Sequence, residues 1–324
     1  MDVLHICAGW QEWNGAANIA RMLMDEQRRE GHEVSFATWA KMRELRAADE
    51  VWIHCGWLPC LWWAALWGRN VHWMPEACYD PVRLRFHGWK KWLAGPFERF
   101  FLRRAKAIVA TCEAEKGWIE SYLGRRCPPI EVTDIKRFFQ LEKSWSNELE
   151  LESGVGGVEH VEGDGDNPST HQPSTHKPTN RPNDKTGQTL FANKDLHILY
   201  LGRRHPLKGV EYLESAVQEL STHQPSTHKP TNQLRIVSDA FGEEKEKVWD
   251  WCDVLVLPTL SENFGLVIAE ALERGKRVIT TDGAPAWGDG NTYGGRLVYL
   301  KGYRDGSDEK RVELLKNAIE RMCS

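Results

Sequence analysis

Two carboxylates near the start of one helix are the clearest chemical feature of the sequence. Glu262 and Glu270 are separated by seven residues, with Glu262 in the loop after a strand and Glu270 in the helix that follows. Asn263 and Gly265 allow the chain to turn where this helix begins near Phe264, which leaves backbone N–H groups free to meet an anion. The pattern predicts a site for an anionic ligand that also carries hydroxyl groups.

Short apolar strands alternate with helical segments along most of the chain. We predict strands over residues 3–7, 32–38, 50–54, 70–74, 107–111, 129–133, 196–201, 234–237, 254–258 and 277–281. We predict helices over residues 15–30, 58–67, 97–105, 113–123, 209–220, 243–250, 264–274 and 311–323. Such alternation is typical of parallel βαβ units. The sequence therefore predicts an α/β protein of two Rossmann-like domains whose strand ends face a cleft.

The alternation is absent between residues 141 and 195. This stretch is acidic and glycine-rich and then contains STHQPSTHKPTN, a polar sequence that occurs again at residues 221–232. Low-complexity polar sequence cannot bury a core and is expected to be disordered. We therefore predict an N-terminal domain over 1–140, a disordered linker over 141–195, and a C-terminal domain over 196–324 with a disordered insertion at 221–232.

Composition argues against several classes of protein. The formal net charge is only −4 over 324 residues, which disfavours a general nucleic-acid binder. The eight cysteines are scattered, which fits a reducing cytoplasm and provides no paired zinc motif. The N-terminus has no basic, apolar leader, so we expect no signal peptide. The histidines of the two repeats form no helix face, so we expect no metal site there.

Four stretches resemble one family in the same order along the chain. They are WNGAANIARMLMDEQRREGHEVSFAT, YDPVRLRFHGWKKWLAGPFERFFLRRAKAIVATCEAEKGWI, LGRRHPLKGVEYLESA and SENFGLVIAEALERGK. Together they resemble the retaining glycosyltransferases of the GT-B fold, family 4, in the group of lipopolysaccharide-type hexosyltransferases. The resemblance implies an enzyme that moves a sugar, with retention, from a nucleoside-diphosphate sugar to a glycan or lipid-linked acceptor in cell-envelope assembly. It implies no metal and no other cofactor.

The resemblance also implies catalytic roles for three residues. Arg203 and Lys208 would hold the donor diphosphate and its leaving charge, because two cations there stabilise developing negative charge without a metal. Glu262 would lie near the transferred sugar. The plainer interpretation of each of these side chains is solvated surface charge.

Further residues are implied in binding the donor. They are Gly15, Asn263, Phe264, Gly265, Leu266 and Glu270. Glu270 would bind the ribose, and backbone N–H groups at the start of its helix would meet phosphate or sugar oxygens. Gly15 would let the N-terminal loop approach the donor phosphates, although it could equally be an ordinary turn glycine.

The sequence departs from the family at two places. Glu76 stands where the family has a sugar-contacting histidine, and His54 matches another family histidine at a strand end. We expect both to contact the sugar or acceptor, with a loop carboxylate and a core histidine as the alternatives. The second domain has room for only one helix between Val237 and Trp249, where the family has a helix, a strand and a further helix. A catalytically degenerate sugar-nucleotide-binding protein is therefore an alternative, as is a nucleotide-sugar epimerase of the same fold.

Residues 83–106 carry eight Lys or Arg residues, one acidic residue and several aromatic residues. One interpretation is peripheral contact with the cytoplasmic face of a membrane, through basic residues and aromatic anchors. The other is a solvated helix face with a packed aromatic side. We expect a cytoplasmic protein under either interpretation, with the first placing it at the inner membrane face.

Overall fold

The computed structural model describes residues 1–7, 15–55, 59–86, 88–139, 141, 196–222, 232–238 and 240–323. The predicted linker, except for Leu141, lies outside the described residues. So does the second repeat, apart from Ser221, Thr222 and Asn232.

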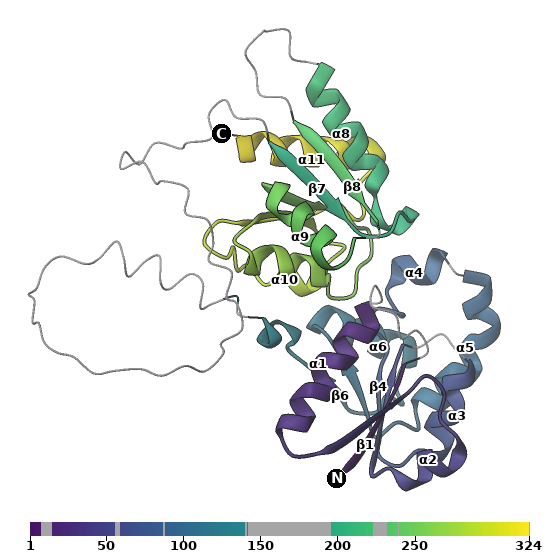
Figure 1. Cartoon of the computed structure of the whole chain (residues 1–324). Coiled ribbons are helices and arrows are strands. Elements are labelled where there is room, and N and C mark those ends of the chain that lie inside the picture. Colours follow the sequence, from purple (N-terminus) through teal and green to yellow (C-terminus); the bar gives the residue numbers. More distant parts are fainter. Residues whose placement is uncertain are drawn as a thin grey trace, which may run out of the picture.

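Two parallel sheets form the framework (Figure 1). The first sheet has the strand order β2-β1-β3-β4-β5-β6 and the second has the order β11-β10-β9-β7-β8. The strands of the first are β1 (Asp2–Cys7), β2 (Glu33–Ala37), β3 (Glu50–His54), β4 (Val71–Met74), β5 (Ala107–Ala110) and β6 (Ile130–Val132). Those of the second are β7 (His197–Leu201), β8 (Gln233–Val237), β9 (Val254–Leu257), β10 (Arg277–Thr281) and β11 (Leu297–Leu300). All the strand pairs are parallel, as the alternation of strands and helices predicts.

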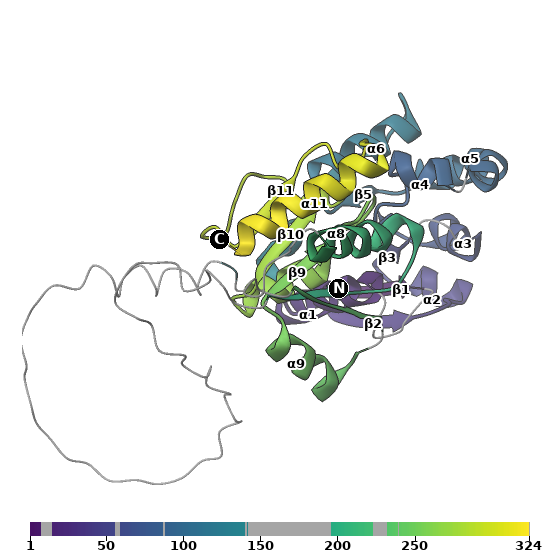
Figure 2. The same ribbon diagram turned by 90° about the horizontal axis from the view of Figure 1, so that it is seen from above.

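Helices follow most of the strands and cover the sheets. In the first half they are α1 (Gly15–Arg29), α2 (Met42–Ala47), α3 (Pro59–Trp67), α4 (Pro81–Phe86), α5 (Gly88–Leu102) and α6 (Glu113–Leu123). In the second half they are α8 (Val210–Thr222), α9 (Gly242–Trp251), α10 (Leu266–Glu273) and α11 (Asp308–Cys323). Seen from above, α8 and α11 lie side by side on one face of the second sheet, and α9 lies on the other face (Figure 2). Each half is thus a Rossmann-like domain, as predicted.

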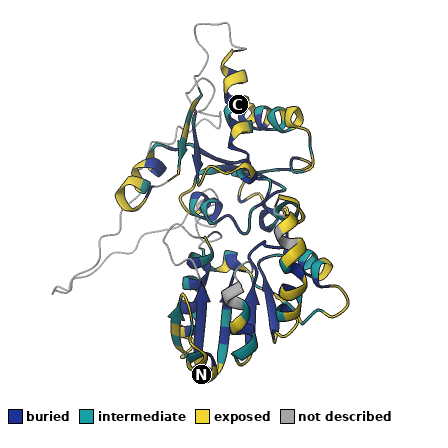
Figure 3. Cartoon of the chain, turned by 90° about the vertical axis from the view of Figure 1, so that its right-hand side faces the viewer, coloured by how far each residue is buried: buried dark blue, intermediate teal, exposed yellow. Residues whose placement is uncertain are grey.

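Burial follows from the parallel topology. Every residue of β4, β5 and β9 is buried, because helices or the other domain cover the sheets (Figure 3). On α1, the residues Ile19, Ala20 and Leu23 share one buried face at helical spacing. The apolar core of the second domain continues into the first through Ile19 and Ile135, so apolar side chains join the two domains.

The sequence missed several elements. It did not predict α2, α4 or β11, and it placed the start of α5 at residue 97, whereas the helix begins at Gly88. Gly95 and Pro96 look like a helix break in the sequence, but α5 runs through both. As predicted, one helix, α9, fills the short connection between β8 and β9.

One glycine is required by close packing of the loops that follow β9 and β10. A Cβ at Gly283 would lie 2.1 Å from the carbonyl oxygen of Thr259, which is backbone and cannot move aside. The Gly283 carbonyl also accepts a hydrogen bond from the Glu262 N–H at 2.8 Å. Any side chain here would push the Glu262 loop away from β10.

We therefore expect Gly283→Ala to destabilise the protein by roughly 3 kcal/mol, at the upper end of the usual cost of overpacking. Gly117→Ala is the matched control, because its added methyl group meets no atom within 4 Å in the middle of α6. It should stabilise the helix by about 0.5–1 kcal/mol. Urea unfolding followed by tryptophan fluorescence measures both, and equal midpoints for the two variants would contradict this account.

Candidate active site

The strand order of the second sheet indicates where a ligand would bind. The order in which successive strands are added reverses between β7 and β9, and ligands of such sheets bind at the carboxyl ends of the strands beside this switch point. Arg203 follows β7, and Glu262 lies in the loop that follows β9. The topology therefore brings together two residues that are 59 positions apart in the sequence.

Lys208 and Glu262 form an ion pair at this point. The Lys208 Nζ donates a very short hydrogen bond to Glu262 Oε2, and each side chain is only 17% exposed. Burial alone would raise the pKa of Glu262, but the Lys208 ammonium, with smaller contributions from Arg83 and the Asn263 N–H, lowers it below its usual value. Glu262 is therefore a carboxylate at neutral pH, held close to a cation.

Backbone contacts fix Lys208 relative to this loop. Lys208 ends a short 3-10 helix, Pro206–Lys208, whose Leu207 N–H donates to His205 Nδ1 at 3.2 Å. The Leu207 carbonyl accepts hydrogen bonds from the Leu260 N–H at 2.9 Å and the Thr259 hydroxyl at 3.1 Å. Gly209 follows with a left-handed φ of +61°, and a Cβ there would lie 2.2 Å from the Pro258 carbonyl oxygen.

Arg203 lies on the same side of the sheet and is exposed. Its carbonyl accepts a hydrogen bond from the Tyr200 hydroxyl at 2.8 Å, which holds the backbone of this turn. Among the residues that the structure describes, its guanidinium makes no ion pair. The side chain is therefore available to an anionic ligand.

The N-terminus of α10 lies between the two glutamates. Gly265 caps it with a left-handed φ of +77°, and Leu266 is its first residue. The Ile268 N–H donates to the Gly265 carbonyl at 2.8 Å, so the helix offers no partner only to the N–H groups of Leu266 and Val267. The Phe264 ring is buried against Trp287, 5.2 Å between centroids, and its carbonyl accepts the Trp287 indole N–H at 2.6 Å. Phe264 thus anchors the loop through its side chain, and only its backbone could reach a ligand.

Glu270 lies on α10, and the structure pairs it with a residue that the sequence did not single out. Its Oε2 lies 2.6 Å from Lys245 Nζ on α9, and both side chains are half-buried. A ligand that takes Glu270 would also meet Lys245. In the sequence, Lys245 stands out only by its position near the start of a helix. Many surface lysines share that position, so the sequence could not identify Lys245 as a site residue.

His54 and Glu76 are both buried in the first domain. His54 has no exposed surface, and its Nε2 lies 3.0 Å from His5 Nδ1. Burial lowers the pKa of His54 to about 3, so it is neutral. Its Nδ1 lies 3.4 Å from Glu76 Oε1, and burial, followed by the charge of Glu115, raises the pKa of Glu76 well above its usual value. Contact of either residue with a sugar therefore stays a prediction.

Glu115 is a buried carboxyl that the sequence did not single out. Its oxygens accept hydrogen bonds from the Ala77 N–H at 2.5 Å, and from the Thr111 N–H and hydroxyl, both at 2.7 Å. These contacts hold the turn after β4, where Glu76 and Ala77 both have positive φ. Burial raises the pKa of Glu115 despite these bonds.

Side chains of the N-terminal domain form hydrogen bonds with the loop that carries Glu262. The Ser261 hydroxyl donates to Asp80 Oδ2 at 2.5 Å and accepts from Arg83 Nε at 3.0 Å. The Thr111 hydroxyl lies 3.1 Å from Asn263 Oδ1. The residues on both sides of Glu262 are therefore bonded to the N-terminal domain, and the carboxyl ends of β4 and β5 face that of β9.

Two other contacts join the domains at this interface. Arg304, from the loop before α11, pairs with the fully buried Asp80, and its guanidinium lies 5.1 Å from the Trp118 ring centroid. Lys136 Nζ pairs with Asp289 at 2.6 Å. The sequence singled out none of these residues as a site residue.

Gly15 is the first residue of α1 and is exposed. A Cβ there would meet no atom of the described residues within 4 Å, so packing against those residues does not require glycine. The loop that precedes it, residues 8–14, lies outside the described residues.

One surface groove of the described structure does not suit an anionic ligand. A surface groove of about 430 Å³ between α8 and α11 is lined largely by acids, including Glu211, Asp308 and Glu313, and would repel an anionic ligand. No group of three or more His, Cys, Asp or Glu side chains in the described residues could hold a metal ion. None of the described helices has both the length and the apolar character needed to cross a bilayer.

Each half of the chain matches a glycosyltransferase family model. The model described as glycosyl transferase 4-like domain matches residues 36–133. The model described as glycosyl transferases group 1 matches residues 231–317. Comparison with curated protein sequences gives no match.

Several solved structures share the whole arrangement at low sequence identity. Sucrose-phosphate synthase from Thermosynechococcus elongatus is similar with a TM-score of 0.61 and 12% identity, over 99% of this chain and 89% of that one. The UDP-forming α,α-trehalose-phosphate synthase from Burkholderia vietnamiensis gives 0.56 and 10%, over 98% and 91%. WaaG, a glycosyltransferase involved in lipopolysaccharide biosynthesis, gives 0.54 and 12%, over 98% and 90%.

These likenesses show the fold, which is GT-B, and the two family models show the domain type of each half. With a glycosyltransferase domain in each half and the two parallel-sheet domains of the GT-B fold, the chain is a GT-B glycosyltransferase and hence a transferase enzyme.

Proposed function

We propose that the protein transfers a sugar from a nucleoside-diphosphate sugar to a glycan or lipid-linked acceptor, with Arg203, Lys208 and the first turn of α10 binding the donor diphosphate. The observation that carries the proposal is the half-buried Lys208–Glu262 pair beside the switch point of the second sheet. Arg203 and the N–H groups of α10 add positive potential on the same loop cluster. A diphosphate is the ligand whose charge this arrangement fits.

Departure of the nucleoside diphosphate is the step that these residues would assist. Negative charge grows on the diphosphate as the bond to the sugar breaks, and fixed cations stabilise that charge most where water is largely excluded. Lys208 would turn from Glu262 towards the phosphate, and Glu262 would then face the sugar. Because cations already present in the chain supply the positive charge, the proposal requires no metal ion and no other cofactor.

The donor ribose is assigned to Glu270, beside Lys245. A carboxylate accepts hydrogen bonds from two ribose hydroxyls, and Lys245 Nζ lies 2.6 Å from this one. Gly265 and Leu266 would present backbone N–H groups to phosphate or sugar oxygens. The Asn263 N–H, which donates to Glu262 Oε1 at 3.1 Å, would join them only by leaving that carboxylate. Gly15 would contribute from the end of the N-terminal loop.

Retention of the anomeric configuration is supported by the state of the acids on the acceptor side. A single inverting displacement needs a general base for the acceptor hydroxyl. Three buried carboxyls of the N-terminal domain lie beside the interface. Asp80 is occupied by Arg304 and Ser261. Burial favours the neutral form of Glu76 and Glu115, which is the form that cannot take a proton. Binding and positioning at the donor phosphate would then carry most of the catalysis.

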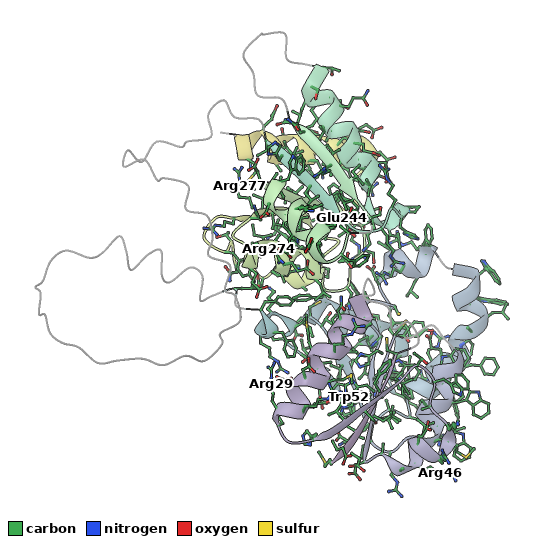
Figure 4. All side chains as sticks on the ribbon, viewed as in Figure 1. Arg29, Arg46, Trp52, Glu244, Arg274 and Arg277 are labelled. Carbon is green, nitrogen blue, oxygen red and sulfur yellow. The ribbon has the colours of Figure 1, made fainter. Side chains whose placement is uncertain are left out.

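The acceptor is proposed to be made or held at the cytoplasmic face of a membrane, as in lipopolysaccharide or other cell-envelope polysaccharide synthesis. On α5, Trp89, Trp92, Leu93, Phe97 and Phe100 recur at helical spacing on one face, and each is more than half exposed. Figure 4 shows ring side chains along α5 that project away from the domain. The only acidic residue of 83–106, Glu98, is buried and accepts the Tyr122 hydroxyl at 2.8 Å, so the exposed part of the segment is basic. Exposed aromatic residues on a basic helix suit an anionic lipid surface.

The donor site is tested by Arg203→Ala and Lys208→Ala. Each should lower the rate of nucleoside-diphosphate release from the cognate nucleotide sugar by roughly 10²–10³-fold, as loss of one charge-stabilising donor does elsewhere. The cognate sugar is found first by a thermal-shift screen of nucleotide sugars. Arg204→Ala is the matched control, because Arg204 is exposed and pairs with Glu214 at 2.5 Å.

Unchanged turnover in the Arg203 and Lys208 variants would exclude this donor site. Donor binding without transfer to any acceptor would favour the degenerate binding protein. An isomer of the donor formed without acceptor would favour the epimerase.

The raised pKa of Glu76 is tested by the pH dependence of stability. Because its folded pKa is raised, the unfolded chain ionises first, and wild-type stability falls as pH rises from the unfolded pKa towards the folded one. Glu76→Gln removes this loss. The Tm of the variant minus that of wild type should therefore increase from about pH 4, near the normal pKa of Glu, to about pH 8. Glu113→Gln, at an exposed site on α6, should show no such trend. A difference that stays flat with pH would mean that Glu76 is ionised.

Membrane contact is tested by co-sedimentation with vesicles. Wild type should bind vesicles that contain phosphatidylglycerol and not pure phosphatidylcholine vesicles, because both charge and aromatic insertion are needed. The double variant Trp92→Ser, Phe97→Ser should lose most of this binding, whereas Phe241→Ser, at an exposed ring of the other domain, should keep it. Equal binding by all three proteins would exclude α5 as the contact.

A further inference from the structure

Arg83 is a half-buried cation that reaches the candidate active site from the opposite domain. It lies on α4, which follows β4 of the N-terminal domain. Its Nε donates to the Ser261 hydroxyl at 3.0 Å, and Ser261 immediately precedes Glu262. Lys208 and Arg83 therefore flank the same two residues, one from each domain.

The position of Arg83 is fixed by neighbours that are themselves buried. Asp80 begins the turn into α4, accepts the Val82 N–H at 2.8 Å and has no exposed surface. Because the Ser261 hydroxyl donates to Asp80, its lone pairs face Arg83. The same Asp80 also pairs with Arg304. The Nε end of the guanidinium is thus held in place, and its other edge can point elsewhere.

The charge of Arg83 has no counter-ion among the described residues. Asp80 is paired with Arg304, and Glu262 with Lys208. No hydrogen bond or ion pair in the described part of the chain reaches the two terminal nitrogens of Arg83. The acids that feel its charge are Glu262, whose partner is Lys208, and Glu76 and Glu115, in which burial favours the neutral form.

We propose that Arg83 is a third cation of the donor site and that its terminal nitrogens bind the diphosphate of the nucleoside-diphosphate sugar. A half-buried guanidinium held at Nε presents two parallel N–H groups, the geometry that matches phosphate oxygens. The inference rests on the proposed donor site. It adds that the phosphate site is complete only when the two domains are in contact, because one of its three cations belongs to the N-terminal domain.

This arrangement couples domain contact to charge stabilisation. With the domains apart, Arg203, Lys208 and the start of α10 could still bind a nucleotide, but the cation that faces the diphosphate from the other side would be missing. Departure of the diphosphate would then be assisted only in the closed state, which protects the donor from transfer to water.

The test is calorimetric binding of UDP, ADP and GDP, and of the matching monophosphates, to wild type and three variants. For the nucleoside diphosphate that wild type binds best, Arg83→Ala should weaken binding roughly 10- to 100-fold, as loss of hydrogen bonds to a charged group does. It should weaken the matching monophosphate much less, so that selectivity for the diphosphate falls. Arg83→Lys should restore part of the affinity through charge alone. Arg85→Ala, at an exposed position two residues along α4, is the matched control and should bind as wild type does.

Three outcomes would overturn the inference. Unchanged diphosphate binding in Arg83→Ala would show that Arg83 does not touch the donor, and a higher KM for the acceptor in that variant would assign it to the acceptor instead. Equal weakening of diphosphate and monophosphate would show that it only holds the domains together. If wild type binds none of the nucleotides, the proposed function fails first, and that result is distinct from a failure of Arg83 alone.

Discussion

The geometry of the site depends on how the loop after β9 is held. Its three consecutive polar residues each bond to a different element: Ser261 to the turn before α4, Glu262 to Lys208, and Asn263 to the end of β5. Its backbone is held as well, because the N–H groups of Leu260 and Glu262 donate to carbonyls in the loops after β7 and β10. The loop is therefore rigid without being helix or strand, and it carries the negative charge around which the cations gather.

Electrostatics explain why an ion pair at this position suits a site that must accept an anion. A pair buried to this degree has lost much of its hydration, so each partner depends on the other. An incoming diphosphate offers Lys208 a more highly charged partner, and it frees Glu262 where the sugar would lie. Arg83 favours the ionised form of Glu262. When the diphosphate binds, Lys208 therefore exchanges one anionic partner, the Glu262 carboxylate, for another. In the N-terminal domain, by contrast, neither Glu76 nor Glu115 has, among the described residues, a cation as close as Lys208 is to Glu262, and burial raises the pKa of both carboxyls.

The sequence predicted the features that depend on residues close together in the chain, namely strands, helices and the spacing of motifs. Strand and helix alternation gives two parallel sheets, and the spacing of Glu262 and Glu270 places one on a loop and the other on α10. Contacts between the domains left no such signal, because Asp80 and Ser261 are 181 residues apart, and Asp80 and Arg304 are 224 apart. His54 was ambiguous for a related reason: its neutral state follows from burial, and the residues around it, such as His5 in β1 and Glu76 after β4, come from other parts of the chain. The course of α5 through Pro96 was missed because the packing of the helix against α3 outweighs a local break.

The interface between the domains has an apolar side and a polar side. The difference affects where the two domains separate to admit substrates. Near the end of the N-terminal domain, Ile135 and the Phe139 ring pack into the apolar core of the C-terminal domain, with Phe139 6.1 Å from Phe264 between ring centroids. Near α4 the contacts are mainly hydrogen bonds and ion pairs centred on Asp80, with one ring contact between Phe86 and His205, 5.3 Å between centroids. Separating apolar surfaces in water costs free energy in proportion to the area exposed, whereas separated charges regain hydration that offsets much of their lost attraction. The free energy of opening is therefore lower at the α4 side than at the Phe139 side. The cations that face the diphosphate lie on the α4 side, so the part of the interface that opens most readily is also the part that completes the site when it closes.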